Sequence, residues 1–252
     1  MGTPAGCFIF ANSHLTEIDF PSLAQSYSFN VVDNSALVSL SLPALTETAR
    51  GFLDIERNSA LTLLEFPALI HVGGSLGLQR NRALTISLPV LQSVNDSVFI
   101  DEPALVELSV PALALVNRQL IVTSGVDVLF SDLEVVDGVL IIVRSPATSI
   151  SFPALTSAGS VSIFQASTVT SLTLPLFETV TRDFRVGGTA IENLDLPALV
   201  SVGGLLSMSA NPQLERIAVP LLESVGSLSI TNDPLLTECV GPLIVDVGDC
   251  VQ

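Results

Sequence analysis

Proline returns at an almost constant interval along the whole chain, and this repeat limits the folds that the sequence can adopt. Successive positions are separated by 22, 24, 22, 22, 20, 22, 22, 22, 23 and 22 residues. A fixed period in this range is typical of a solenoid, in which each repeat forms one coil and packs on its neighbours. The positions are Pro21, Pro43, Pro67, Pro89, Pro111, Pro153, Pro175, Pro197, Pro220 and Pro242, with Ser131 at the same place in one coil.

Apolar and polar residues alternate ahead of each proline, as Leu194 and Leu196 do in the coil 191–213. This spacing predicts a β-strand with one buried face. Because proline has no N–H to donate, a central strand cannot contain it, and each coil must turn a corner there. Two columns of inward residues result: Ile18, Leu40, Leu64, Ile86, Leu108, Val128, Ile150, Leu172, Leu194 and Ile217, then Phe20, Leu42, Phe66, Leu88, Val110, Phe130, Phe152, Leu174, Leu196 and Val219.

A second corner and a second strand complete each coil. The corner contains glycine pairs such as Gly73-Gly74 and Gly203-Gly204, so we expect positive φ there. The second strand alternates again, with Leu206 and Met208 inward in the coil 191–213. Asparagine side chains are then predicted to bond the backbone of a closing bend, at Asn34, Asn58, Asn81, Asn211 and Asn232.

The sequence therefore predicts an all-β fold, a parallel β-helix of about eleven coils with a repeat of about 22 residues. We expect a single domain over 1–252 that starts in the middle of a coil and has a C-terminal cap at 236–252.

The repeated pattern L-x-x-L-x-[FL]-P-A-L-x-x-V-G-G-x-L-x-I-x-x-N resembles the receptor L domain and its leucine-rich-repeat-like relatives in surface proteins of bacteria, fungi and protists. The resemblance runs from Phe8 to Gly241 and is strongest at Leu61–Asn81 and Ile191–Asn232. It implies a right-handed β-helix with a large parallel sheet and a role in extracellular recognition or surface architecture. The chain departs from the receptor versions in lacking their paired cysteines, and the coil Val126–Ser145 has lost its proline and asparagine. The pattern carries no ligand residues, because every matched position is a core or corner position.

Composition limits the partners. The formal net charge is −16, with nine basic residues that are all arginine, and a surface this acidic repels nucleic acid and anionic lipid. The apolar runs, such as Val139–Val143, are too short to cross a bilayer. We therefore expect neither nucleic-acid binding nor membrane insertion.

Catalytic and metal-binding patterns are sparse. His14 and His71 lie in different coils, with no cysteine or carboxylate at metal-ligand spacing, so no metal site and no cofactor are expected. We expect a protein that is not an enzyme, because no two neighbouring coils place carboxylates side by side in the outward row of the first strand. A β-helix enzyme acting on polysaccharides remains the alternative. An ice-binding solenoid is a further alternative, because serine and threonine recur along that row.

The chain has three cysteines. Cys239 occupies an inward column, and Cys250 falls near the next inward position, so the two are predicted either to form a disulfide that closes the core or to remain buried thiols. Cys7 has no evident partner in the sequence.

Outward positions of the second strand change character along the chain. They are polar in the first and last coils and apolar in the middle, at Phe99, Ile121, Ile141, Val143 and Phe164. Parallel stacking would join these five side chains into one patch, with Asp101, Glu102 and Arg144 at its rim. A covering loop, or a register shift in the coil Val126–Ser145, would remove the patch.

If the patch forms, it is the predicted contact surface for a protein or glycan ligand or for a homodimer. The function that we expect is a non-catalytic extracellular or cell-surface module, for recognition, adhesion or structure.

Overall fold

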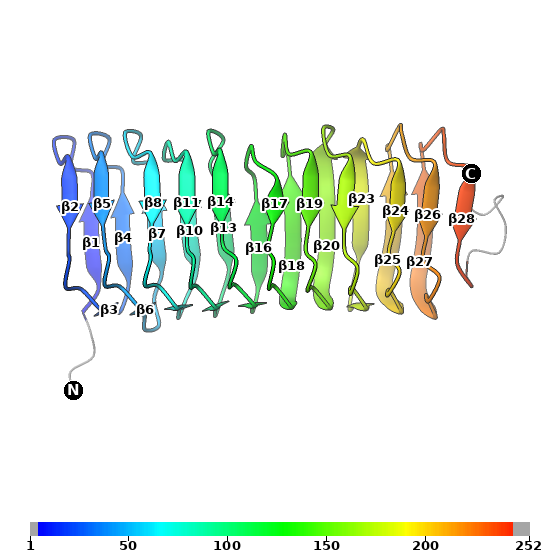
Figure 1. Ribbon diagram of the computed structural model, residues 1–252, viewed down its shortest axis with the longest axis horizontal. Coiled ribbons are helices and arrows are strands. Elements are labelled where there is room, and N and C mark those ends of the chain that lie inside the picture. The colour runs from blue at the N-terminus through cyan, green and yellow to red at the C-terminus, as the bar shows by residue number, and fades with distance from the viewer. Residues whose placement is uncertain (1–4, 244–252) are drawn as a thin grey trace.

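A computed structural model describes residues 5–243, which wind into a rod of about eleven stacked coils. The regular secondary structure of these residues consists of 28 β-strands. Residues 5–243 contain no helix that is long and apolar enough to span a membrane. The described chain starts at one end of the rod and finishes at the other, so neighbouring coils are also neighbours in sequence (Figure 1). The predicted all-β solenoid is confirmed.

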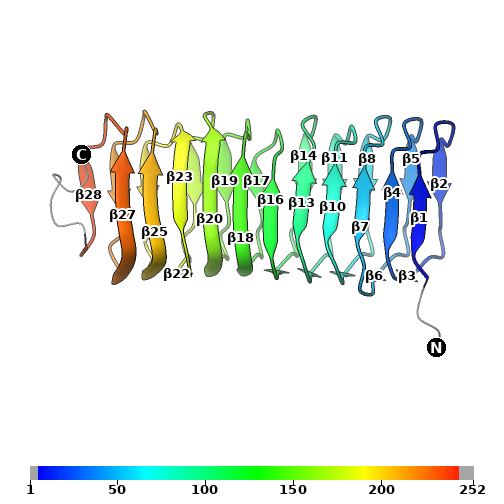
Figure 2. The ribbon, with the colours of Figure 1, turned by 180° about the vertical axis from the view of Figure 1, so that it is seen from behind.

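One large parallel sheet of 17 strands runs the length of the rod (Figure 2). Most coils contribute a short strand and a longer one, and the two merge into one long strand in β18, β20, β25 and β27. The strands are β1 Cys7–Phe10, β3 Gln25–Ser26, β4 Phe29–Val32, β6 Glu47–Thr48, β7 Leu53–Glu56, β9 His71–Val72, β10 Leu76–Gln79, β12 Ser93–Val94, β13 Val98–Asp101, β15 Leu115–Val116, β16 Gln119–Val122, β18 Val135–Val143, β20 Ser157–Ala166, β22 Thr179–Val180, β23 Phe184–Thr189, β25 Ser201–Ser209 and β27 Ser224–Thr231.

Short strands form the opposite side, which is divided into four separate sheets. Pairing is interrupted between β5 and β8, between β14 and β17, and between β21 and β24. These strands are β2 Glu17–Asp19, β5 Ser39–Ser41, β8 Leu63–Glu65, β11 Thr85–Ser87, β14 Glu107–Ser109, β17 Val128–Leu129, β19 Ser149–Ser151, β21 Ser171–Thr173, β24 Asn193–Asp195, β26 Arg216–Ala218 and β28 Glu238–Val240.

The coils wind in a right-handed sense, as comparison of the two sides in Figures 1 and 2 shows. The core lies between the two sides and consists of the predicted columns. Leu194 and Ile217, for example, are both fully buried and are register partners in β24 and β26. Phe20 is the exception in its column: it is 38% exposed, because its coil has a described neighbour on one side only, although its ring meets that of Phe29 edge-on.

The glycines at the second corner are required for a reason that differs from the prediction. Gly73 and Gly203 do not have positive φ. Instead, an added Cβ would lie 2.5 Å from Ala49 O at Gly73 and 2.3 Å from Thr181 O at Gly203. The expectation of positive φ was wrong: at these two glycines the backbone of the preceding coil lies too close for a Cβ.

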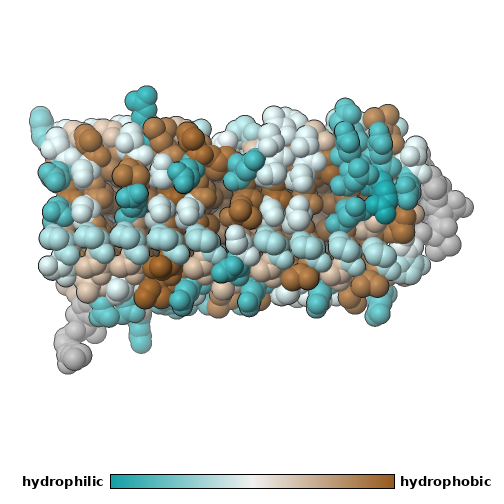
Figure 3. Space-filling model, in the orientation of Figure 1, coloured by the Kyte–Doolittle hydropathy of each residue, from teal (hydrophilic) through white to brown (hydrophobic). Residues whose placement is uncertain are grey.

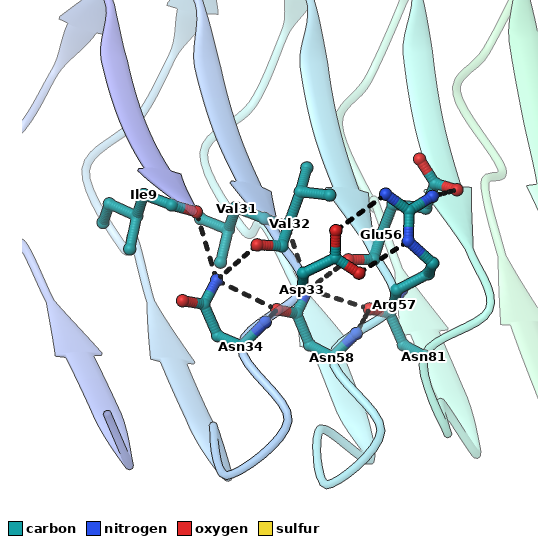
Figure 4. A network of polar contacts seen from close by, with 9 residues as sticks. All are labelled: Ile9, Val31, Val32, Asp33, Asn34, Glu56, Arg57, Asn58 and Asn81. Atoms are coloured by element: carbon teal, nitrogen blue, oxygen red, sulfur yellow. Dashed lines mark hydrogen bonds and ion pairs between the residues drawn. The ribbon is translucent and has the colours of Figure 1, made fainter. Parts of the chain in front are cut away.

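A ladder of buried asparagines closes the early coils (Figure 4). Asn58 Oδ1 accepts hydrogen bonds from the backbone N and from Nδ2 of Asn34, at 3.0 and 3.2 Å. Asn58 Nδ2 donates in turn to Val31 O, Glu56 O and Asn81 Oδ1 at 2.9–3.1 Å. Both Asn34 and Asn58 are fully buried. The predicted role of these amides is confirmed, since buried polar groups need such partners.

Positive φ occurs in the residue just before the ladder position. The residues concerned are Ala11, Asp33, Arg57, Arg80, Arg144, Gln165, Ala210 and Asn232, together with Gly188. Asn232 was therefore assigned wrongly to the ladder. It has a φ of 59° and is exposed, and Asp233 occupies the ladder position, where its Oδ1 accepts from Asn211 N at 2.7 Å.

The first ladder ends at a carboxyl group. Glu102 Oε1 accepts from Asn81 N and Nδ2 at 3.0 and 2.7 Å, and a carboxylate offers no donor to continue the chain of bonds. Glu102 is fully buried. Within residues 5–243, neither Glu102 Oε2 nor Ser124 Oγ, at the next position of the column, has a hydrogen-bond partner.

The C-terminal cysteine prediction stays a prediction. Cys239 lies in β28, half-buried against the core as its column predicts. Cys250 and most of the predicted cap at 236–252 lie outside the described residues. Cys7 is a half-buried free thiol in β1, and burial raises its pKa.

Candidate interaction surface

The solvent side of the large sheet brings the predicted patch residues together. In register, Phe99 of β13 lies beside Ile121 of β16, and Ile121 lies beside Ile141 of β18. Two residues further along the strands, Val143 lies beside Phe164 of β20. Phe164 is 41% exposed, and the other four are half-buried, in line with their outward positions. The five side chains therefore form one contiguous surface.

Neither predicted objection to this surface applies. β18 does contain an irregularity between Val136 and Val139, but the register then continues unbroken from Val139 to Val143. The irregular coil thus keeps Ile141 outward. No described segment crosses this side of the sheet in Figure 2.

Three apolar residues extend the surface and were missed in the sequence. Leu115 of β15 lies beside Val135 of β18, and Val139 lies beside Gln119, all half-buried. The signal was present: Leu115 and Val135 precede the inward Val116 and Val136 and therefore point outward. We call the eight residues Phe99, Leu115, Ile121, Val135, Val139, Ile141, Val143 and Phe164 the apolar band.

The rim of the band differs from the prediction at one residue. Asp101 is partly exposed, with its Oδ2 3.5 Å from Arg80 Nε, and the exposed Arg144 donates from Nε to Gln165 Oε1 at 3.2 Å. Glu102 is not at the rim. It is fully buried in the closing ladder, because the strand ends at Asp101 and the chain turns inward.

A notch of about 260 Å³ borders the band on its N-terminal side. Its floor is Gly77, where an added Cβ would lie 2.6 Å from Asp54 Oδ1. The notch exists because this one position in the outward row has no side chain. The lining residues are Phe52, Asp54, Ser75, Gly77, Gln79 and Phe99.

Asp54 is the charged group of the notch and lacks a partner. Within residues 5–243 its carboxylate makes no hydrogen bond and no ion pair, since the nearby Arg57 binds Asp33 at 2.6 and 2.9 Å and also contacts Glu56. Burial, and then the charge of Glu56, raises the pKa of Asp54, whereas Arg57 acts in the opposite direction. A cation in the notch would offset the burial and the repulsion that disfavour the charged form of Asp54.

The opposite, short-strand side carries a second set of exposed apolar residues. Figure 3 shows them over β5 to β14, whereas hydrophilic residues dominate near the C-terminal end. Val106 is 73% exposed and Leu129 is 51% exposed, and they line a hollow of about 660 Å³ where β14 and β17 fail to pair. The 20-residue interval from Pro111 to Ser131 places a shortened coil at this break.

The residues considered for chemistry are not brought together. His14 ring Nδ1 is 3.0 Å from Ser13 Oγ, and His71 Nδ1 is 2.8 Å from Ser93 Oγ, in separate coils. Within residues 5–243 no three His, Cys, Asp or Glu side chains gather where they could hold a metal ion. On the short-strand side Glu65 has Ser87 as its register neighbour, and Leu129 interrupts the hydroxyl row beside Ser151.

Comparison of the chain with protein-family models, with curated proteins and with solved structures returns no match.

Proposed function

We propose that this chain is a non-catalytic recognition or structural module of the cell surface or extracellular space, and that it binds through the solvent side of its large sheet. The observation that carries the proposal is the register that places Phe99, Ile121 and Ile141 side by side on that open face. A contiguous apolar patch on a solvated surface commonly marks an interaction site. Charged groups at both ends would set the orientation of a partner.

The repeat architecture supports the same role. A solenoid offers an extended regular surface and little concave space, which suits contact with a macromolecule better than enclosure of a small substrate. The resemblance to the receptor L domain supports an extracellular setting and a protein or glycan partner. The acidic surface of this chain would disfavour binding to nucleic acid and to anionic membranes.

A paired substitution tests the proposal. Phe99→Asp with Ile141→Asp places two charges in the apolar band without touching the core, so the fold is retained while self-association, and capture on glycan and protein arrays, is lost. The matched control is Val106→Asp with Leu129→Asp, which places the same charges on the short-strand side. Equal behaviour of the two double variants in both assays would refute this binding face.

A further inference from the structure

We propose that two copies of this chain associate face to face through their large sheets, with the rods antiparallel, and that Arg185 of each copy enters the Asp54 notch of the other. This inference rests on the proposed binding face and names its partner.

The spacing of charges along one outward row motivates the two-fold arrangement. Counting coils from Ile121 toward the N-terminus, Phe99, Gly77 and Asp54 follow in register. Counting toward the C-terminus, Ile141, Ser162 and Arg185 follow in the same row. Asp54 and Arg185 are thus each three coils from Ile121. A two-fold axis that runs parallel to the strands, midway between the two facing sheets and over Ile121, places each Arg185 opposite an Asp54.

The chemistry of the notch suits a guanidinium group. Asp54 supplies a carboxylate without a partner, and Phe52 and Phe99 supply two aromatic rings beside it. Arginine combines a planar charge for the carboxylate with a face that stacks on such rings. Arg185 is available, because its side chain is 54% exposed and its contact with Asp183, at 2.9 Å, leaves other N–H groups free.

The remaining pairs of the row are also compatible. The same axis places Phe99 opposite Ile141, and Gly77 opposite the small Ser162. Packed sheets lie about 10 Å apart, a gap that an arginine side chain can cross from one face to the other. Six coil steps from Asp54 to Arg185 cover about 29 Å, so each copy would bury on the order of 600 Å², the lower end for a specific interface. We therefore expect a weak dimer.

The acidic residue next to the notch meets no like charge across the contact. Glu56 lies two residues after Asp54 in β7, and the axis places it opposite Gly187, two residues after Arg185 in β23. The net charge of −16 repels two copies, so orientation depends on the few arginines of the face.

Charge reversal tests the pairing by sedimentation equilibrium at about 1–300 µM protein. Asp54→Arg and Arg185→Asp alone each weaken dimerisation by about tenfold or more, and the double variant recovers to within about threefold of the wild type. Glu65→Arg and Arg82→Asp are controls, since they make the same charge changes at exposed positions away from the large-sheet face. Circular dichroism checks each fold, and Asp54→Asn replaces Asp54→Arg if the latter does not fold.

The outcomes separate this inference from the proposed function. A wild type that stays monomeric throughout the range, or a double variant no better than the single ones, overturns the homodimer. The binding face would still stand if Phe99→Asp with Ile141→Asp abolished capture of another ligand. If Glu65→Arg and Arg82→Asp also abolished dimerisation, the Asp54–Arg185 pairing would be rejected, because the effect would then follow net charge alone.

Discussion

Asn34 donates its side-chain N–H to Oδ1 of Asn58, one coil further along the rod, and both amides are fully buried. Each asparagine is acceptor for the coil before it and donor to the coil after it. The ladder therefore requires an amide, a group that does both.

Replacing Asn58 by aspartate tests this requirement with almost no change in shape. The variant loses the three hydrogen bonds that Nδ2 donates and places a charge beside the carbonyls of Val31 and Glu56. We expect the free energy of unfolding to fall by about 3 kcal/mol or more. Urea denaturation measures it. Asn232→Asp is the control: it is exposed, outside the ladder, and should change stability by less than about 0.5 kcal/mol; similar losses would contradict the ladder assignment.

Leu194 tests the core columns. It is fully buried in β24, and Leu194→Ala should cost about 2–5 kcal/mol through the cavity that it leaves. Ser207→Ala, at an outward position of β25, should stay within about 0.5 kcal/mol. The comparison needs only the two denaturant midpoints, and equal shifts would reject the inward and outward assignments.

Gly138 tests the close approach at the second corner. An added Cβ would lie 1.9 Å from Arg118 O, so Gly138→Ala must displace the backbone between two coils. We expect a loss of about 1–3 kcal/mol, as for other overpacked sites. At Gly125 the nearest atom to an added Cβ is 3.3 Å away, and Gly125→Ala should be milder. The melting temperatures of the two variants decide, and a milder effect at Gly138 would be inconsistent with the corner geometry.

Glu102 gives a prediction for pH. Burial raises its pKa above the ordinary value, and hydrogen bonds from Asn81 oppose this shift. Folding therefore shifts the equilibrium of Glu102 toward its protonated form, relative to the unfolded chain. The stability that protonated Glu102 contributes to the fold is fully present below about pH 4.3, the pKa of the unfolded chain. It is lost as the pH rises through the raised pKa of the folded chain.

Glu102→Gln removes this titration while keeping an oxygen for Asn81. Its new N–H₂ group takes the place of Glu102 Oε2, which lacks a hydrogen-bond partner within residues 5–243. The variant should gain about 1–3 kcal/mol over the wild type at pH 7–8, and the gain should shrink toward pH 4. Unfolding curves across this range measure it. A difference that does not change with pH would mean that Glu102 does not titrate in the folded chain.

Much of the fold could be predicted because its pattern repeats. The spacing of Leu194 and Ile217 is visible in almost every coil, so many observations support each column. The outward side of Ile121 and Ile141 follows from the same alternation. Features that occur once were harder to predict: the notch depends on one glycine in an outward row, and only the backbone contacts show why Gly138 cannot carry a side chain. Asn232 and Asp233 are adjacent polar residues, and which one enters the ladder depends on a φ angle that the sequence does not encode simply.

The two sides of the rod differ in continuity, and this has a mechanical consequence. The large sheet is hydrogen-bonded from β1 to β27 without a break, whereas pairing on the other side stops between β5 and β8, β14 and β17, and β21 and β24. A load that bends the rod so as to stretch the large sheet must break its ladder bonds. Bending in the opposite sense opens joints at which no ladder bond exists. The rod is therefore stiffer when bent in one sense than in the other, and the break nearest its mid-length lies between β14 and β17.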